Sequence, residues 1–364
     1  MIIHFFTARR YHLVPVISKG FATDYLRDAE QFFVLCGNDK LDRKLYIELF
    51  KQLEFNNYEF CLSYWQLFKL LLRFRKQTLL FHAGSYSLYF TALLLNCKNI
   101  NWVCWGGGTT ISNNWRSKIG GIVKRVMFSR YNSIVTLMEP ERKEIIENFG
   151  LSPLKIQTIS YTTVSEDETK IDDLCEKLLR AEVSYNDKPV VLLGNSHHWI
   201  DSYISLLDIL KPYKGKIQVQ CMLNYKFEKG PKYESLISKG YSIFGDDFKT
   251  NETFYSDRAE YIRYMNGCDI YICAVEQQTG LGAIYTCLCL GKKIYITGNN
   301  LDWVCQAFDP VVFHLDTIKE GLSFEDFIKP ISIEEKLRNY QSIVDSKRIN
   351  RENWHHYLKK IDQV

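Results

Sequence analysis

A glycine-rich segment in the second half of the sequence carries the clearest chemistry. Residues 277–282 read Gln-Gln-Thr-Gly-Leu-Gly and follow an apolar, strand-like run. Gly280 and Gly282 allow close backbone approach, and a helix that starts there offers free N–H groups and the positive end of its dipole. We predict that the backbone of Gly280, Leu281 and Gly282, with the Gln278 side chain, holds a diphosphate.

This segment differs from a dinucleotide fingerprint. It is not Gly-x-Gly-x-x-Gly, and it lacks the acidic residue placed for the ribose of NAD, so a dehydrogenase is not indicated. Glu276, directly before it, is a candidate for binding sugar or ribose hydroxyls; the alternative is a solvated turn carboxylate.

A second polar turn lies earlier, after the apolar run at 190–193. Gly194, Asn195 and Ser196 follow that run and precede a helix-like segment. Backbone N–H groups at such a strand end can meet a phosphate or a sugar hydroxyl. The alternative is an ordinary strand-to-helix turn in which Asn or Ser caps the helix.

Two strand ends in the first half offer further candidates. His82 ends the apolar run 78–82, and at a sheet edge it is a candidate general base or acceptor ligand, or simply a structural histidine. Gly106, Gly107 and Gly108 follow the next run, and three successive glycines suit a backbone that approaches a ligand. The alternative is a flexible surface loop.

The candidate site residues above are placed at strand ends by a pattern that runs along all 364 residues. Short apolar runs alternate with longer amphipathic segments. The alternation indicates an α/β fold with parallel sheets, and its repetition indicates two Rossmann-like domains facing across a cleft. Predicted strands are 2–6, 32–36, 78–82, 101–105, 133–138, 156–160, 190–193, 217–222, 241–244, 269–274, 293–296 and 311–315. Predicted helices include 41–53, 63–75, 86–95, 116–128, 200–210, 233–238, 257–266, 283–290, 301–307 and 333–361.

The polar stretch 163–188 marks the domain boundary. We therefore expect an N-terminal acceptor or membrane-facing domain at 1–165 and a nucleotide-sugar domain at 186–330. A C-terminal helical segment, 331–364, is expected to pack back on the first domain.

Composition excludes several classes. With 46% hydrophobic residues, 24% charged residues and 23 Tyr, 22 Phe and 7 Trp, the chain is not disordered. No apolar run is long enough to span a bilayer, and the opening residues read as a strand, so we expect no signal peptide. The 11 Cys contain no Cys-x-x-Cys pair and are expected to be reduced core thiols of a cytoplasmic protein, without disulfides or zinc.

Charge is distributed unevenly although the total is only +4. Residues 1–165 carry 21 Lys/Arg against 12 Asp/Glu, a net charge of +9, and the remainder carries 25 against 30, a net charge of −5. No acidic residue lies between Glu59 and Glu139. Basic amphipathic helices there would suit an anionic membrane surface. Buried helices with solvated Lys and Arg tips are the alternative, and no nucleic-acid motif accompanies the basic residues.

The sequence resembles glycosyltransferase family 56, the bacterial TDP-4-acetamido-4,6-dideoxygalactose:lipid II transferases. The segments that carry the resemblance occur in the family's order over nearly the whole chain. They are Phe81-His82, 102–107, 192–196, Tyr225 with Tyr233, Phe244-Gly245, Tyr261 with Cys268-Asp269, Gln278 with 280–282, and Asn300 with Trp303.

The resemblance implies a GT-B fold, a metal-independent transferase and no cofactor beyond the donor substrate. It also implies a nucleotide-sugar donor in the second domain, with Tyr225 and Glu276 touching nucleotide or sugar. The sequence departs from the family at Gly108, where an acidic residue is typical, and at Gln277, where Arg is typical. The Glu-x7-Glu pattern of many retaining GT-B enzymes is missing, since Ile284 stands eight residues after Glu276.

Taken together, we expect transfer of a 6-deoxy or amino-deoxy sugar from a dTDP-linked or other nucleoside-diphosphate donor. The expected acceptor is a polyprenyl-pyrophosphate-linked oligosaccharide of O-antigen, capsule or common-antigen synthesis. The protein would lie at the cytoplasmic face of the inner membrane as a peripheral protein, with His82 and Glu276 catalytic and no nucleic-acid partner. Alternatives are a nucleotide-sugar epimerase or hydrolase on the same two-domain plan, and a catalytically degenerate GT-B binding partner.

Overall fold

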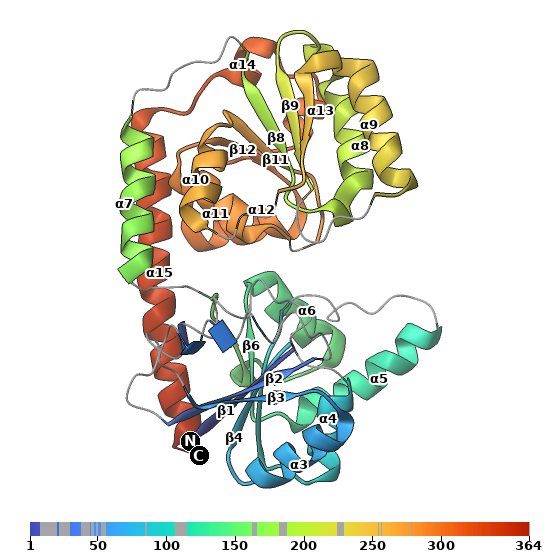
Figure 1. Cartoon of the computed structure of the whole chain (residues 1–364), viewed down its shortest axis with the longest axis vertical. Coiled ribbons are helices and arrows are strands. Elements are labelled where there is room, and N and C mark those ends of the chain that lie inside the picture. Colours follow the sequence, from blue (N-terminus) through green and yellow to red (C-terminus); the bar gives the residue numbers. More distant parts are fainter. Residues whose placement is uncertain are drawn as a thin grey trace. The chain divides into compact units, whose positions relative to one another are not determined.

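The chain divides into two compact units, residues 1–165 with 347–364 and residues 166–346. Figure 1 shows both in a computed structural model. The structure describes residues 1–7, 20–21, 30–37, 44, 47–48, 50–51, 56–83, 86–105, 115–161, 166–181, 188–223, 229–253, 255, 257–277 and 279–363.

The first unit is built on a seven-stranded sheet of order β3-β2-β1-β4-β5-β6-β7, in which all neighbours are parallel. Its strands are β1 (Ile2–Thr7), β2 (Gln31–Cys36), β3 (Tyr58–Cys61), β4 (Thr78–His82), β5 (Asn99–Val103), β6 (Ser133–Thr136) and β7 (Ile156–Thr158). Parallel strands require crossover connections, which the helices between them supply.

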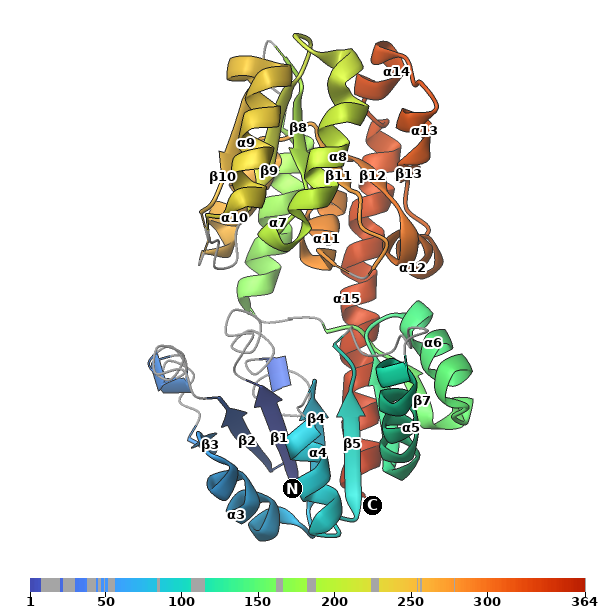
Figure 2. The same ribbon diagram turned by 90° about the vertical axis from the view of Figure 1, so that its right-hand side faces the viewer.

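Helices cover both faces of this sheet, as Figure 2 shows. One face packs against α3 (Tyr64–Phe74), α4 (Tyr86–Leu94), α5 (Trp115–Arg130) and α6 (Glu139–Phe149), which share a core with Ile3, Phe5 and Phe81. The other face, with Ile2 and Phe6, packs against the end of α15 (Ile333–Asp362). Alternate residues of β1 therefore enter opposite cores, as the period of two requires. A short 3-10 helix, η3 (Pro153–Lys155), precedes β7.

The second unit holds a six-stranded parallel sheet of order β10-β9-β8-β11-β12-β13. Its strands are β8 (Val190–Leu193), β9 (Gln218–Met222), β10 (Phe248–Asn251), β11 (Ile270–Cys273), β12 (Lys293–Ile296) and β13 (Phe313–His314). Its helices are α7 (Glu166–Arg180), α8 (Ile200–Leu210), α9 (Pro231–Phe244), α10 (Arg258–Asn266), α11 (Leu281–Cys289), α12 (Gly298–Phe308), α13 (Asp316–Lys319), α14 (Phe324–Ile328), and the 3-10 helices η4 (His197–Trp199), η5 (Lys211–Tyr213) and η6 (Gly245–Asp247).

The α/β class with two parallel sheets is confirmed, one predicted strand is wrong, and two elements were not predicted. Residues 241–244 form no strand but end α9, and the strand lies just after them as β10. The polar stretch 163–188 contains the helix α7. The edge strand β3 was not predicted, since it is only four residues long and buries one of them fully.

Both sheets reverse their strand order next to the first strand, between β1 and β4 and between β8 and β11. In open α/β sheets, ligands bind outside the carboxyl ends of the strands at such a switch point. Each unit therefore has one position where a site is expected. None of the described helices is long and apolar enough to cross a bilayer.

Candidate functional site

Three loops leave the second sheet at its switch point. Ile272 of β11 is paired with Leu193 of β8 on one side and with Tyr295 of β12 on the other. Because the strands are parallel, the segments 194–199, 274–280 and 297–300 emerge at the same edge. The predicted residues Gly194, Asn195, Ser196, Glu276, Gly280, Leu281 and Gly282 are therefore brought together there.

The turn after β8 is organised by a buried tyrosine. Gly194 has φ of +64°, and a Cβ there would lie 2.1 Å from the Tyr203 ring. The Tyr203 hydroxyl accepts from the N–H groups of Asn195 (3.1 Å) and Ser196 (3.0 Å) and donates to the Ser196 carbonyl (2.6 Å). The expectation that these N–H groups are free for a phosphate is therefore wrong, because Tyr203 already occupies them.

Asn195 instead offers its side chain. It is buried, and its Oδ1 has no hydrogen-bond partner within the described part of the chain. Its amide lies against Gly280, where a Cβ would be 2.8 Å from Asn195 Cγ. An unpaired buried amide oxygen costs free energy unless a ligand or water completes it. The Asn195 side chain therefore offers a hydrogen-bond acceptor to a ligand beside the glycine-rich turn.

The start of α11 provides donors next to that amide. Gly280 is the N-cap, with φ of +66° and no side-chain cap, and its carbonyl accepts from the N–H groups of Ala283 and Ile284. The N–H groups of Leu281 and Gly282 donate to no group in the described ranges. The first turn holds no acidic residue, and a Cβ at Gly282 would meet nothing within 4 Å. This helix end can accept an anion without rearrangement.

Two side chains fix the turn that leads into α11. Asn300 is fully buried, donates from Nδ2 to the Thr279 carbonyl (2.9 Å) and accepts from the Thr279 N–H (3.3 Å). Trp199 donates from Nε1 to Thr279 Oγ1 (3.0 Å). Asn300 was noted in the sequence only as part of the family resemblance, and no role was predicted for it. No sequence pattern indicated a role for Trp199.

Glu276 lies exposed on the same loop, in contact with the end of β12. Its Oε1 accepts from Thr297 Oγ1 (3.2 Å) and its carbonyl accepts from the Asn299 N–H (2.9 Å). Gly298 has φ of +60°, and a Cβ there would lie 2.5 Å from the Glu276 carbonyl oxygen. The carboxylate is therefore held at the edge of the site with one oxygen free of Thr297.

Five predicted site residues lie outside the described residues: Gln278, Tyr225, Gly106, Gly107 and Gly108. Within the described ranges, no group of three or more His, Cys, Asp or Glu side chains is placed to hold a metal ion.

In the first unit the described residue nearest the switch point is His82, the last residue of β4. His82 is fully buried on the α15 face of the sheet, and its ring stacks on Phe6 at 4.0 Å between centroids. The expectation that it points from the sheet edge into a cleft is wrong, because β4 is buried on both faces and residue 82 shares the face of Phe6. A base must reach the proton that it removes, and this ring has no exposed atom.

His82 belongs to a buried chain of hydrogen bonds. Trp105 Nε1 donates to the Tyr161 hydroxyl (2.7 Å), which lies 2.6 Å from His82 Nδ1, and His82 Nε2 lies 3.0 Å from His4 Nδ1. The two ring nitrogens of His82 thus link the Tyr161 hydroxyl to the His4 ring. Burial lowers the pKa of His4 to about 3 and that of His82 well below its ordinary value, so both rings are neutral.

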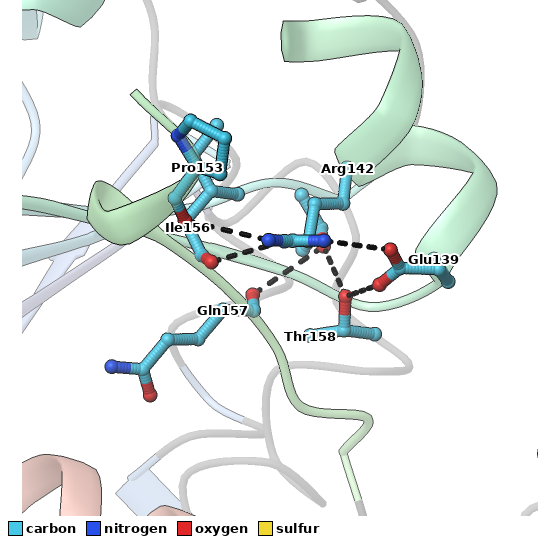
Figure 3. Close-up of polar contacts among 7 residues, drawn as sticks. Glu139, Arg142, Pro153, Ile156, Gln157 and Thr158 are labelled. Carbon is cyan, nitrogen blue, oxygen red and sulfur yellow. Dashed lines mark hydrogen bonds and ion pairs between the residues drawn. The ribbon is translucent and has the colours of Figure 1, made fainter. Parts of the chain in front are cut away.

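A second polar cluster joins the first turn of α6 to η3 and β7, as drawn in Figure 3. Arg142 donates to Glu139 (2.8 Å) and to the carbonyls of Ile156 (3.1 Å) and Pro153 (3.4 Å), and Thr158 donates to Glu139 (2.7 Å). These bonds tie the first turn of α6 to β7.

Glu141, in the same turn of α6, was missed by sequence reasoning. It is buried; its Oε2 accepts from the Leu137 N–H (3.2 Å), and its Oε1 has no partner in the described ranges. Burial raises the pKa of Glu141 to about 7. In the sequence, a Glu in the first turn of a helix indicates only a helix-capping residue, so nothing predicted that this carboxyl group would be buried.

Solved structures of similar fold cover nearly the whole chain. A glycosyltransferase from Rickettsia africae ESF-5 is 13% identical with a TM-score of 0.65, covering 98% of each chain. Anabaena Alr3699/HepE in complex with UDP-glucose is 12% identical with a TM-score of 0.66, covering 99% of each chain. The UDP-GlcNAc 2-epimerase from Neisseria meningitidis bound to UDP-GlcNAc is 15% identical with a TM-score of 0.57, covering 97% of this chain and 98% of that one.

No protein-family model matches the chain, and no curated protein matches its sequence. The structural similarity shows the fold: two Rossmann-like units of the GT-B type, found in glycosyltransferases and in UDP-GlcNAc 2-epimerases. The resemblance to glycosyltransferase family 56 in particular stays a prediction.

Proposed function

We propose that the chain is a glycosyltransferase that binds a nucleoside-diphosphate sugar at the switch point of its second unit. The observation that carries the proposal is the uncapped start of α11, where the N–H groups of Leu281 and Gly282 point outward beside the unpaired Asn195 oxygen. The Rickettsia africae glycosyltransferase and the UDP-glucose complex of the Anabaena protein support it.

In this proposal the diphosphate lies on the start of α11, with Gln278 as a further ligand. Asn195 contacts the phosphate or the sugar, and Gly194 and Ser196 act by shaping its turn. Glu276, with Tyr225, contacts ribose or sugar hydroxyls. Asn300 and Trp199 are positioning residues, since both act on Thr279.

The reaction follows from this placement. An acceptor hydroxyl oxygen attacks C1 of the donor sugar, the bond from C1 to the diphosphate oxygen breaks, and the hydroxyl proton passes to a base. The helix dipole and the two N–H groups stabilise the negative charge that develops on the leaving diphosphate, so no bound metal or cofactor is required. Because His82 is buried, we do not assign proton removal to it.

For the substrates we propose a dTDP-linked 6-deoxy or amino-deoxy sugar and a polyprenyl-pyrophosphate-linked oligosaccharide of bacterial surface-polysaccharide synthesis. These finer assignments follow from the resemblance to glycosyltransferase family 56. They place the protein at the cytoplasmic face of the inner membrane as a peripheral protein.

A single pair of variants tests the donor site. Gly282→Asp puts a carboxylate into the first turn of α11, which favours the helix but repels a diphosphate. Gly282→Ala is its matched control, because a Cβ there meets nothing. We expect dTDP, UDP or GDP to raise the melting temperature of the wild type and of Gly282→Ala, and to leave Gly282→Asp unchanged. The assignment fails if no nucleotide shifts the wild type, or if Gly282→Asp responds like it.

A nucleotide-sugar 2-epimerase is the second candidate, favoured by the similarity to the Neisseria meningitidis epimerase. It needs no acceptor. Incubating the protein with UDP-GlcNAc alone and resolving the sugars separates the two: an epimerised sugar or free UDP indicates the epimerase, and turnover only with an added acceptor indicates the transferase.

A further inference from the structure

Three consecutive helices of the first unit expose apolar side chains on their outer faces. Each of α3, α4 and α5 presents a pair spaced by one or two helical turns, and every member is at least 42% exposed: Trp65 and Leu72, Phe90 and Leu94, Ile122 and Val126. Figures 1 and 2 show these helices on the side of the seven-stranded sheet opposite α15. We call these six residues, with the basic residues named below, the α3–α5 surface.

The inner faces of these helices already pack against the sheet. Leu67, Leu70, Leu71 and Phe74 of α3 are buried, and residues of all three helices share one core with the sheet. A helix that covers a sheet ordinarily shows a polar face to solvent. The exposed pairs therefore add apolar area that the fold of this unit does not use.

The same surface is basic. Lys69, Lys76, Lys98, Arg125 and Arg130 are exposed on these helices or the turns that follow them, and residues 60–138 contain no Asp or Glu. Lys69 Nζ lies 5.4 Å from the centre of the Trp65 ring. On α3, residues 65, 69 and 72 follow one stripe, so apolar and basic side chains alternate along a single line.

We propose that the α3–α5 surface docks on an anionic phospholipid bilayer, with the apolar pairs entering the interface and the Lys and Arg side chains facing the headgroups. A second copy of the chain is disfavoured because a two-fold contact would bring the basic residues of both copies together. Nucleic acid is disfavoured because aliphatic side chains such as Leu94 and Ile122 offer no ring for base stacking.

The proposal deepens the proposed function, on which it rests for the identity of a lipid-linked acceptor. It names the surface through which the first unit would reach that acceptor. Membrane binding itself depends on exposure and charge alone, so vesicle binding and nucleotide binding can succeed or fail independently.

Co-sedimentation of the full-length protein with vesicles tests the docking surface. We expect binding to phosphatidylglycerol–phosphatidylcholine vesicles, weaker binding at high salt and little binding to phosphatidylcholine alone. Lys69→Glu should lower the partition coefficient by about fivefold or more, and Trp65→Ser by about tenfold. Both variants should keep the wild-type response to nucleotides in the thermal-shift assay.

Two matched controls lie elsewhere on the chain. Tyr241→Ser removes an exposed aromatic side chain of α9 in the second unit, and Lys214→Glu reverses an exposed lysine of the same unit; both should bind vesicles as the wild type does. The proposal is overturned if anionic vesicles do not sediment the protein, or if Lys69→Glu and Trp65→Ser bind like the controls. It is also overturned if Trp65→Ser turns a dimer into a monomer, or if a short DNA binds through Lys69 while vesicles do not.

Discussion

The two sheets share one strand order on both sides of the switch point, but the described residues near that point differ between the two units. In the second unit, small and polar residues meet there: Gly194, Asn195 and Gly280, beside an uncapped helix start. In the first unit, β4 ends at His82, which lies among aromatic neighbours and hydrogen-bonds to His4 and Tyr161.

This difference shows that a switch point alone does not make a binding site; the residues at the strand ends must also leave space and free hydrogen-bonding groups. Glycines let the backbone approach a ligand and leave N–H groups unused. A buried ring at the end of a strand, such as that of His82, fills space in the core, and its nitrogens already have hydrogen-bond partners. The donor site that we propose lies in the second unit, where the N–H groups of Leu281 and Gly282 have no partner among the described residues, and we expect the first unit to respond to changes that disturb its buried network.

The largest expected effect is acid sensitivity confined to the first unit. His4 has a pKa of about 3 in the folded protein against 6.5 for an ordinary histidine, so the unfolded state binds more protons between these values. The contribution of neutral, buried His4 to the free energy of unfolding is fully present above pH 6.5. It is lost as the pH falls toward 3, by up to about 5 kcal/mol.

Amide hydrogen exchange, corrected for intrinsic rates, measures this loss strand by strand. Protection in β1 and β4 should fall between pH 7 and pH 4, while β8 and β11 change less, and His4→Phe should reduce the difference. Equal protection of β1 at pH 7 and pH 4 would contradict the prediction.

The second effect concerns the glycine at the other switch point. Gly194→Ala places a Cβ within 2.1 Å of Tyr203 at a φ of +64°, so we expect a loss of about 3 to 4 kcal/mol of unfolding free energy. Denaturant titration checks it, with Gly282→Ala expected within about 0.5 kcal/mol of the wild type. Similar losses in both variants would show that the two positions do not differ as described.

The third effect concerns Glu141, whose contribution to stability decreases as the pH rises, the opposite of the pH dependence expected for His4. The pKa of Glu141 is raised to about 7 from 4.5, so its contribution to stability is present below pH 4.5 and is lost as the pH rises through 7. Glu141→Gln keeps an acceptor for the Leu137 N–H and should stabilise the first unit at pH 8 by up to about 3 kcal/mol. Denaturation at pH 5 and pH 8 measures it; an unchanged pH dependence in the variant would count against a buried carboxyl.

The smallest effect sharpens the description of the donor site. Asn300→Ala removes both bonds to Thr279, so the turn before α11 loses its fixed position. We expect roughly tenfold weaker nucleotide binding, about 1.4 kcal/mol, measured by calorimetry. Trp199→Phe removes only the side-chain bond to Thr279 Oγ1 and should lose less; equal losses would mean that the two Asn300 contacts with the Thr279 backbone contribute nothing beyond it.

Much of the fold could be predicted because period and position are local properties. The runs at 78–82 and 190–193 form β4 and β8 as predicted, and α11 begins directly after Gly280. The prediction failed at 241–244, where a short apolar run fits a strand or a helix equally, and contact with β9 was made by the next segment instead.

The direction of a side chain was harder to predict than its element. β4 is buried along its whole length, so the sequence contains no alternation that tells which face His82 joins. Similarly, the N–H groups of Asn195 and Ser196 were expected to be free because Tyr203, which accepts from both, lies eight and seven residues further on, in the first turn of α8.

The sequence by itself determined the α/β class, the glycine-rich start of α11 and the acid-free stretch that becomes the α3–α5 surface, because each follows from residue type and local spacing. Only the tertiary structure decided that His82 is buried and that Asn195, Asn300 and Trp199 meet around the turn before α11. Those outcomes depend on partners 20 to 80 residues apart, such as His4 with His82 and Asn300 with Thr279, which no local pattern specifies.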